Sequence, residues 1–381
     1  MELNLYAQSL LWAFGLSLVF GAIANKTNFC TMGAVSDWIN IGDQSRLRAW
    51  FLAIATAIIG VGILEYSGSI DMSLTTSNDT SNPPYRSPNF IWLRHLVGGL
   101  MFGVGMTLAS GCGNKTLVRL GEGNMKSLVV LAIIGVAAWW MLFSNFGYYV
   151  FLQWMLPLGI DFSQHDIAGQ DIATVLAGLS GSEPGPAFGL IVALTLALML
   201  LLWVLRAPDF RNNFELLSAG LIIGLLIVGG WYVTAGSSGQ ALLDELAFRD
   251  QRPFFTGAQS LTFIGPAGHV VQYVKQGFDS IYLTFGVATV GGVIVGSFLY
   301  TLIFRKVRIE WFVTWQDFGM HVAGAVLMGV GGVLAMGCTI GQGITGVSTL
   351  ALGSIVTLIA IIAGSAATMK YQYYLMMRED D

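Results

Sequence analysis

About nine runs of roughly 20 mostly apolar residues limit the possible folds of this chain more than any other feature. Only 10% of the residues are charged, whereas a soluble domain carries roughly 25% because its surface faces water. A helix of this length crosses the hydrocarbon core with every backbone polar group bonded internally. The sequence therefore predicts an all-α polytopic membrane protein. The predicted spans are 3–24, 49–66, 90–111, 127–152, 187–206, 215–234, 281–304, 318–337 and 349–369.

The distribution of lysine and arginine predicts the orientation of these spans. Cytoplasmic loops of membrane proteins carry an excess of basic residues, and here basic residues gather in alternate loops. The intervening segments are poor in them, since 66–90 contains only Arg86 and 153–186 contains neither Lys nor Arg. The alternation predicts an external N-terminus and a cytoplasmic C-terminus. The predicted cytoplasmic set is Arg46, Arg48, Lys115, Arg119, Lys126, Arg206, Arg211, Arg305, Lys306, Arg308 and Lys370.

A repeated motif relates two of the spans. The pattern Gly-Val-Gly, Leu-Ala, Gly-Cys at 103–112 returns 226 residues later at 329–338, and His95 matches His321 at the same offset. The copies lie an odd number of spans apart, so they would cross the membrane in opposite directions. Many secondary transporters hold their substrate near the midplane between such inverted halves. We therefore predict one integral membrane transport domain, 1–381, with pseudo-symmetric halves 1–152 and 187–369 joined by an extracytoplasmic loop at 153–186.

Three cysteines mark a candidate site, since each follows an apolar run and precedes a stretch too polar or glycine-rich for a lipid-facing helix. They are Cys30, Cys112 and Cys338. Irregular backbone at membrane depth is tolerated only where protein buries it or where it lines a wet cavity. Short half-helices after the cysteines would point N–H groups and positive dipole ends at that cavity, which suits an anion. The stretch near Gly220–Gly230, taken as the counterpart of the Cys30 region, lacks cysteine, which predicts an asymmetric line of thiols.

Polar residues beside the cysteines are further candidates. The basic ones could attract an anion or be ordinary residues of the cytoplasmic side. The neutral ones could donate hydrogen bonds to a substrate or cap the half-helices. No catalytic triad, phosphate loop or cofactor fingerprint accompanies them, so the sequence predicts neither an enzyme nor a cofactor, and the net charge of −4 indicates no nucleic-acid partner. The candidates are Lys26, Asn28, Thr31, Asn114, Lys115, Thr339 and Gln342.

At the cysteine segments the sequence resembles the YeeE/YedE family of bacterial inner-membrane sulfur-transport proteins. The resemblance runs from about residue 10 to about residue 368. Its motifs are Asn28-Phe29-Cys30-Thr31-Met32-Gly33, Gly111-Cys112 followed by Leu120-Gly121-Glu122-Gly123, and Gly337-Cys338-Thr339-Ile340-Gly341-Gln342-Gly343.

The resemblance implies a nine-span fold with pseudo-two-fold halves in the inner membrane. The best-understood members import thiosulfate along a central path lined by the three motif cysteines, which places that role on Cys30, Cys112 and Cys338. Some relatives act with a small cytoplasmic sulfur-carrier protein, so such a carrier is an implied partner. Other branches are linked to selenium metabolism or sulfur oxidation.

The leading hypothesis is an importer of thiosulfate or a related inorganic sulfur anion, in which neutral thiols relay the ion without a covalent step. A thiol is a weak donor, and conduction needs sites strong enough to enter yet weak enough to leave. Two alternatives stay open. A membrane thiol enzyme would pass sulfane sulfur or selenium through a persulfide on Cys112 or Cys338. A soft-metal transporter would bind Cu(I) or zinc through the three cysteines, although no CxxC or His-rich spacing is present.

Overall fold

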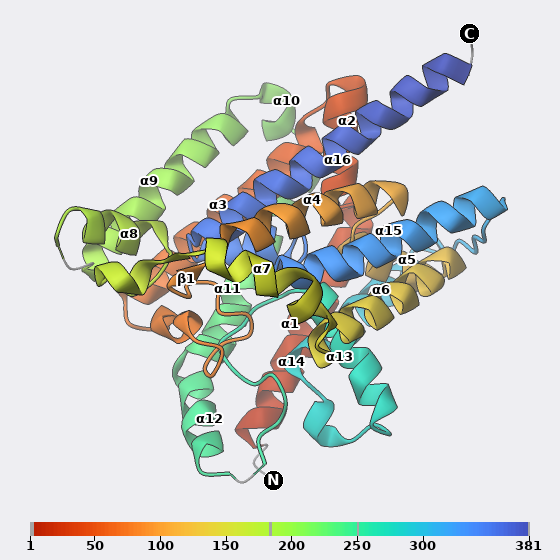
Figure 1. Cartoon of the computed structure of the whole chain (residues 1–381). Helices are drawn as coiled ribbons and strands as arrows, with labels where there is room; N and C mark the ends of the chain where they lie inside the picture. The colour runs from red at the N-terminus through yellow and green to blue at the C-terminus, as the bar shows by residue number, and fades with distance from the viewer. Residues whose placement is uncertain (1–3, 183–184, 250, 380–381) are drawn as a thin grey trace.

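The computed structural model describes residues 4–182, 185–249 and 251–379, and this part of the chain is predominantly helical with almost no strand (Figure 1). Nine helical segments in these ranges are long and apolar enough to cross a membrane, which confirms the predicted fold class. Residues 183–184 of the predicted linker and the ends of the predicted domain lie outside the described residues. The nine segments are Leu5–Ile41, Ser45–Tyr66, Trp92–Gly121, Met125–Phe143, Pro186–Leu205, Phe214–Ala235, Phe285–Ile303, Trp315–Leu334 and Leu352–Arg378.

The predicted span bounds hold to within a few residues except at two ends. Helix α6 (Met125–Phe143) stops well before residue 152, and a π-helical turn, η2 (Tyr148–Leu152), follows. Helix α16 (Leu352–Glu379) continues past residue 369, and its end projects from the bundle (Figure 1). Hydropathy falls where the polar tail begins, but the helix continues. The other long helices are α3 (Ser45–Tyr66), α9 (Pro186–Leu205), α11 (Phe214–Ala235) and α14 (Phe285–Ile303).

Two of the three predicted half-helices are present. Helix α1 (Leu5–Thr27) is followed by α2 (Thr31–Ile41), and α4 (Trp92–Leu108) is followed by α5 (Gly113–Gly121). The third prediction is wrong in form, because α15 (Trp315–Leu334) leads into a π-helical turn, η6 (Gly341–Gly346). Glycines suit this turn because neighbours approach its backbone closely: a Cβ on Gly341 would lie 2.2 Å from the Thr262 hydroxyl.

The segments between the spans carry short elements. The structure confirms that 235–280 is partly ordered, since it contains α12 (Ser237–Ala247) and α13 (Ile264–Lys275). Strand β1 (Asn89–Phe90) pairs antiparallel with β2 (Ile160–Asp161), which ties the segment 66–90 to the predicted linker. The remaining elements are η1 (Met72–Thr76), α7 (Gln153–Met155), η3 (Leu156–Leu158), η4 (Phe162–His165), α8 (Ile172–Leu179), α10 (Pro208–Arg211) and η5 (Ser280–Tyr282).

The packing of α4 against α15 has the reciprocal form of a two-fold relation. A Cβ on Gly98 would lie 2.8 Å from the Gly331 carbonyl oxygen, and one on Gly105 would lie 2.6 Å from that of Gly324. Gly98 and Gly324 are equivalent in the sequence repeat, as are Gly105 and Gly331. A two-fold axis between the helices would produce this exchange of partners. The contact supports inverted halves, which stay a prediction for the whole chain.

Packing between the other helices has the same exchanged pattern. Helix α1 packs along α14, and α3 packs along α11. If α11 is the counterpart of α1 and α14 the counterpart of α3, the two contacts are equivalent. Close approach in the first contact depends on glycine, since a Cβ on Gly296 would lie 1.9 Å from the Leu18 carbonyl oxygen. Small residues therefore bring the halves together around the centre of the bundle.

Candidate functional site

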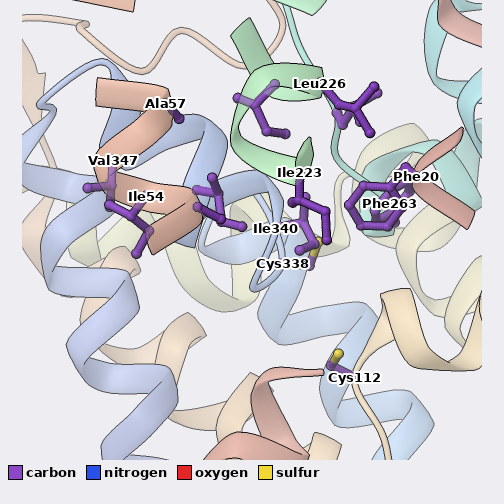
Figure 2. Packing of buried hydrophobic residues seen from close by; sticks show 14 of the residues in the cluster. Phe20, Ile54, Ala57, Cys112, Ile223, Leu226, Phe263, Cys338, Ile340 and Val347 are labelled. Carbon is purple, nitrogen blue, oxygen red and sulfur yellow. The ribbon is translucent and has the colours of Figure 1, made fainter. Parts of the chain in front are cut away.

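The three cysteines lie at breaks between helices in the buried centre of the protein, and Figure 2 shows Cys112 and Cys338. Cys30 precedes α2, Cys112 precedes α5, and Cys338 lies in the turn between α15 and η6. All three are free thiols. The Sγ atoms of Cys30 and Cys112 are 3.8 Å apart, within reach of a weak S–H···S contact. The fold thus brings two free thiols that are 82 positions apart in sequence into contact.

A left-handed backbone conformation interrupts the helix at all three breaks. Two positions before each cysteine stands a residue in the left-handed region: Asn28 with φ 50°, Ser110 with φ 55° and Met336 with φ 63°. A left-handed residue ends an α-helix, and the backbone then folds back onto the last turn. This conformation costs a non-glycine residue roughly 1–2 kcal/mol. The three breaks thus share one backbone geometry.

Beside Cys338, the backbone N–H of Gly341 donates to the thiol sulfur at 3.4 Å. Thr339 approaches the Cys112 thiol from this turn, so the second-half break reaches the first-half thiol pair. Figure 2 shows Cys112 and Cys338 in one apolar core, with Phe263 and Ile223 on the Cys338 side. The predicted line of thiols is therefore compatible with the arrangement of the breaks.

The expected counterpart of the Cys30 region is not where the sequence suggested. Gly220–Gly230 lies inside the continuous helix α11 and contains no break. Two second-half residues directly precede a helix about as short as α2, as Cys30 precedes α2: Gly236 before α12 and Phe263 before α13. With α14 as the counterpart of α3, the contact of α13 with α14 matches that of α2 with α3 and favours Phe263. Its ring lies 5.4 Å from that of Phe20, measured between centroids, and is 1% exposed. A large apolar ring occupies this position instead of a thiol.

Three of the predicted flanking residues gather at the thiol pair. Lys115 Nζ donates to Asn28 Oδ1 at 2.9 Å, and Asn114 Nδ2 donates to the Phe29 carbonyl oxygen at 3.1 Å. These bonds connect the start of α5 to the turn before α2. Lys26, by contrast, is exposed at the end of α1 and takes no part in these two bonds.

Unpartnered polar atoms concentrate at the predicted site. In the described ranges, seven buried side-chain N or O atoms have no hydrogen-bond partner, and four of them belong to predicted candidates. Leaving such an atom unpaired costs about 1–3 kcal/mol, and each of these atoms can still take part in a hydrogen bond. The four atoms are Thr31 Oγ1, Asn114 Oδ1, Thr339 Oγ1 and Gln342 Oε1. The other three belong to Trp50, Gln170 and Ser354.

A cavity of about 290 Å³, here called the Arg94 cavity, reaches the Cys338 break. Its wall includes Met336 and Gly337, directly before the cysteine, together with Thr262, Asn82 and Arg94. Arg94 is held by donation from its Nε to the Leu334 carbonyl oxygen at 2.8 Å. The described residues that line this cavity include an arginine and no carboxylate, so its wall favours an anion.

A larger cavity of about 520 Å³, here called the Arg86 cavity, has the opposite charge. Glu65, Asp71 and Asp171 line it beside Arg86. Burial disfavours the charged form of Arg86, but the ion pair with Glu65 and the field of Asp171 raise its pKa above the ordinary value. The wall of this cavity therefore carries one positive and three negative side chains, and this net negative charge disfavours binding of a dianion. The larger of the two cavities is therefore the one less suited to an anion.

Sequence reasoning missed Arg94 and Thr262. Arg94 stands near the start of a predicted span, where an arginine is usually an interfacial residue. Thr262 lies in a segment without a repeat motif or cysteine. One available signal was the position of Arg94 beside His95, which belongs to the repeat. Among the described residues no group of three His, Cys, Asp or Glu side chains is arranged to hold a metal ion, so the soft-metal alternative gains no support.

Comparison with known proteins shows which family this chain belongs to. A family model described as sulphur transport matches residues 26–367. The thiosulfate transporter TsuA of Escherichia coli is 24% identical over 369 residues, which cover 91% of this chain and 90% of the relative. The thiosulfate transporter TsuA of Spirochaeta thermophila is 24% identical over 368 residues, which cover 92% and 95%. The resemblance seen in the cysteine motifs is thereby confirmed, and the chain belongs to the YeeE/YedE family of sulphur-transport proteins.

Proposed function

We propose that this protein imports thiosulfate, or a closely related inorganic sulfur anion, across the bacterial inner membrane along a path lined by Cys338, Cys112 and Cys30. The observation that carries the proposal is the buried contact of 3.8 Å between the Cys30 and Cys112 sulfurs, together with the Lys115 ammonium group that bonds Asn28, two residues before Cys30. Thiosulfate is a dianion with a large, soft terminal sulfur. A site of neutral thiols with one nearby cation matches both properties.

The anion enters through the Arg94 cavity. In the predicted orientation this cavity lies on the outer side, because the segments 66–90 and 235–280 supply part of its wall. The guanidinium group raises the local anion concentration, and the wall carries no carboxylate to oppose it. Gly337 in the cavity wall directly precedes Cys338, so an anion in the cavity moves next to the Cys338 thiol. The carboxylates of the Arg86 cavity direct anions away from that alternative entrance.

The relay consists of weak, closely spaced contacts. The unpartnered hydroxyls of Thr339 and Thr31 can donate to the anion next to the cysteine thiols. Asn114 and Gln342 each donate from the amide nitrogen to a backbone carbonyl, which leaves the amide oxygen as an acceptor for a thiol proton. A thiol whose proton is held in this way stays neutral and does not repel a dianion. Transport then needs no covalent intermediate.

A membrane sulfurtransferase is the second candidate, and the short distance between Cys30 and Cys112 favours it. A Cys112 thiolate would attack the sulfane sulfur, break the S–S bond and release sulfite, leaving a persulfide. The Cys30 thiolate would then attack the Cys112 sulfur and release hydrosulfide, forming a disulfide that an external dithiol must reduce. Mass spectrometry after turnover distinguishes the two functions, because persulfide or disulfide on Cys112 would contradict the non-covalent relay. If a small cytoplasmic sulfur-carrier protein takes part, the relay would deliver intact thiosulfate to it. In the sulfurtransferase its thiolate would instead attack the outer sulfur of the Cys112 persulfide, take that sulfur and release the Cys112 thiolate.

Uptake of ³⁵S-thiosulfate into vesicles containing the purified full chain tests the proposal. We expect Cys112→Ser, Cys30→Ser and Cys338→Ser each to reduce uptake by about tenfold, since loss of a contact to a charged ligand costs about 1.5–3 kcal/mol. Thr195→Val, on the exposed face of α9 away from all three cysteines, is the matched control and should transport normally. Normal uptake by all three cysteine variants would contradict the assigned path. Excess unlabelled sulfate, which lacks the soft sulfur, should compete weakly.

A further inference from the structure

Helix α5 carries two charges in positions that its own dipole disfavours. Lys115 stands in the first turn, where the positive end of the dipole repels a cation, and Glu122 caps the other end, where the negative end repels an anion. Both residues are largely buried, with side-chain exposures of 10% for Lys115 and 19% for Glu122. Local helix stability therefore does not explain either choice. The explanation must come from the contacts that the two groups make.

The two groups face each other at a distance that neutralises charge without a direct hydrogen bond. Lys115 Nζ lies 3.8 Å from Glu122 Oε1, whereas charge-assisted hydrogen bonds are about 2.7–2.9 Å long. The same Nζ makes its direct bond to Asn28 at 2.9 Å. Among the described residues, Lys115 is the only cation that forms an ion pair with Glu122. Glu122 is thus placed to weaken the field of this lysine.

The backbone of Glu122 is held firmly while its side chain is less constrained. Its carbonyl oxygen accepts from the Arg308 N–H at 3.1 Å. The preceding Gly121 packs against α14, where an added Cβ would lie 2.6 Å from the Ile294 carbonyl oxygen. The fixed backbone therefore keeps the Glu122 side chain within reach of Lys115. Because Lys115 follows Cys112 by one helical turn, this ion pair stands at the end of the thiol line that the basic loop residues mark as cytoplasmic.

We propose that Glu122 is a resident counter-ion of Lys115 which the transported anion displaces, so that Glu122 sets how easily the anion is released. The inference rests on the proposed function. A lysine with no competing carboxylate would hold a dianion too firmly to let it leave, and conduction requires binding weak enough for exit. Glu122 returns to Lys115 as the anion departs. It acts on the substrate through the lysine and is a positioning residue for release.

The test is a pair of kinetic constants for ³⁵S-thiosulfate uptake by vesicles that contain the full chain. Glu122→Gln should lower KM and Vmax together, each about three- to tenfold, because the exposed lysine binds more tightly and releases more slowly. Damage to folding would lower Vmax alone, since fewer transporters would be active. Glu310→Gln is the matched control: it neutralises a nearby carboxylate that bonds Asn124 instead of Lys115, and it should leave KM unchanged.

A double variant separates this role from a structural one. In a Lys115→Gln background, Glu122→Gln should no longer change KM, because the group through which it acts is gone. An unchanged KM in the Glu122→Gln single variant, with normal uptake by the unmodified protein, would overturn the role of Glu122 and leave the proposed function standing. A KM effect that persists without Lys115 would overturn it as well. Absence of thiosulfate uptake by the unmodified protein would overturn both.

Discussion

The breaks at Cys112 and Cys338 share a sequence motif but differ in chemistry. Both follow a helix that ends with a left-handed residue two positions before the cysteine. Cys112 then opens a regular helix with a lysine in its first turn and lies 3.8 Å from a second thiol. Cys338 opens a glycine-rich π turn and accepts a backbone N–H. A duplicated motif thus reproduces a backbone geometry, while neighbours from elsewhere in the chain decide what each copy can bind.

The residues that precede the short helices α2 and α13 also differ between the two halves. Cys30 stands before α2 and Phe263 before α13, so one half presents a thiol where the other presents a buried ring. Two thiols and a lysine therefore gather on one side of the centre, and a single thiol remains on the other. This difference gives the proposed path a direction: an arginine at the entrance and a lysine with a counter-ion at the exit.

The largest effect should come from joining the two thiols of the first-half site. Mild oxidation of a Cys338→Ser variant should link Cys30 to Cys112 and abolish whatever uptake remains, because the sulfurs need to move only a short way from 3.8 Å to form a bond. Peptide mass spectrometry identifies the linked pair, and a reductant should restore uptake. Oxidation of a Cys30→Ser variant should give no Cys112–Cys338 link under the same conditions. If a Cys112–Cys338 disulfide forms as readily as the Cys30–Cys112 disulfide, the close contact of Cys112 with Cys30 does not distinguish the two breaks.

The next effect compares the two cysteines of the repeat. Cys112→Ala should reduce uptake by at least about tenfold and more than Cys338→Ala does, because Cys112 has both Cys30 and Thr339 beside it and Cys338 has a fixed backbone donor that survives the change. Initial rates at matched protein levels measure the ratio. A larger loss in Cys338→Ala would place the narrowest part of the path at the second break.

The two cavities offer a smaller but cleaner contrast. Arg94→Gln should raise KM for thiosulfate about three- to tenfold and make uptake less sensitive to salt, since it removes the cation at the entrance. Glu65→Gln in the Arg86 cavity should leave KM unchanged, although it breaks the ion pair with Arg86. The salt series from low to physiological ionic strength is the measurement. Equal effects of both variants would mean that the Arg94 cavity is not the specific entrance.

The smallest effect concerns the backbone breaks. Ser110 is exposed and has φ 55°, so Ser110→Gly should raise the free energy of unfolding by at most about 1 kcal/mol, because glycine tolerates this region. Ser110→Val should lower it by about 1–2 kcal/mol, since a β-branched residue is strained there. Melting temperatures in detergent compare the variants. A stable Val variant would indicate that the turn can relax and that the left-handed residue is not required.

Much of the architecture was predictable because it depends on local patterns. Hydropathy located all nine spans among the described residues, and polar stretches after Cys30 and Cys112 indicated α2 and α5. The π turn after Cys338 was not predictable, since its form depends on Thr262, Trp50 and Ser354 packing against its glycines. Among the candidate residues, Asn28, Asn114 and Lys115 meet at the thiol pair, while Lys26 does not join them.

By itself, the sequence determined that the chain is a helical membrane protein of the sulphur-transport family and that its cysteines stand at helix breaks. These properties follow from the order of apolar and polar residues along the chain, which decides what can face lipid. Only the tertiary structure decided which groups meet: Cys30 with Cys112, Lys115 with Asn28 and Glu122, and Arg94 with the Cys338 break. Apart from the pair of Lys115 in α5 with Glu122 directly after it, these contacts join segments far apart in sequence. Close packing of glycine-lined helices brings those segments together, and no local pattern records that.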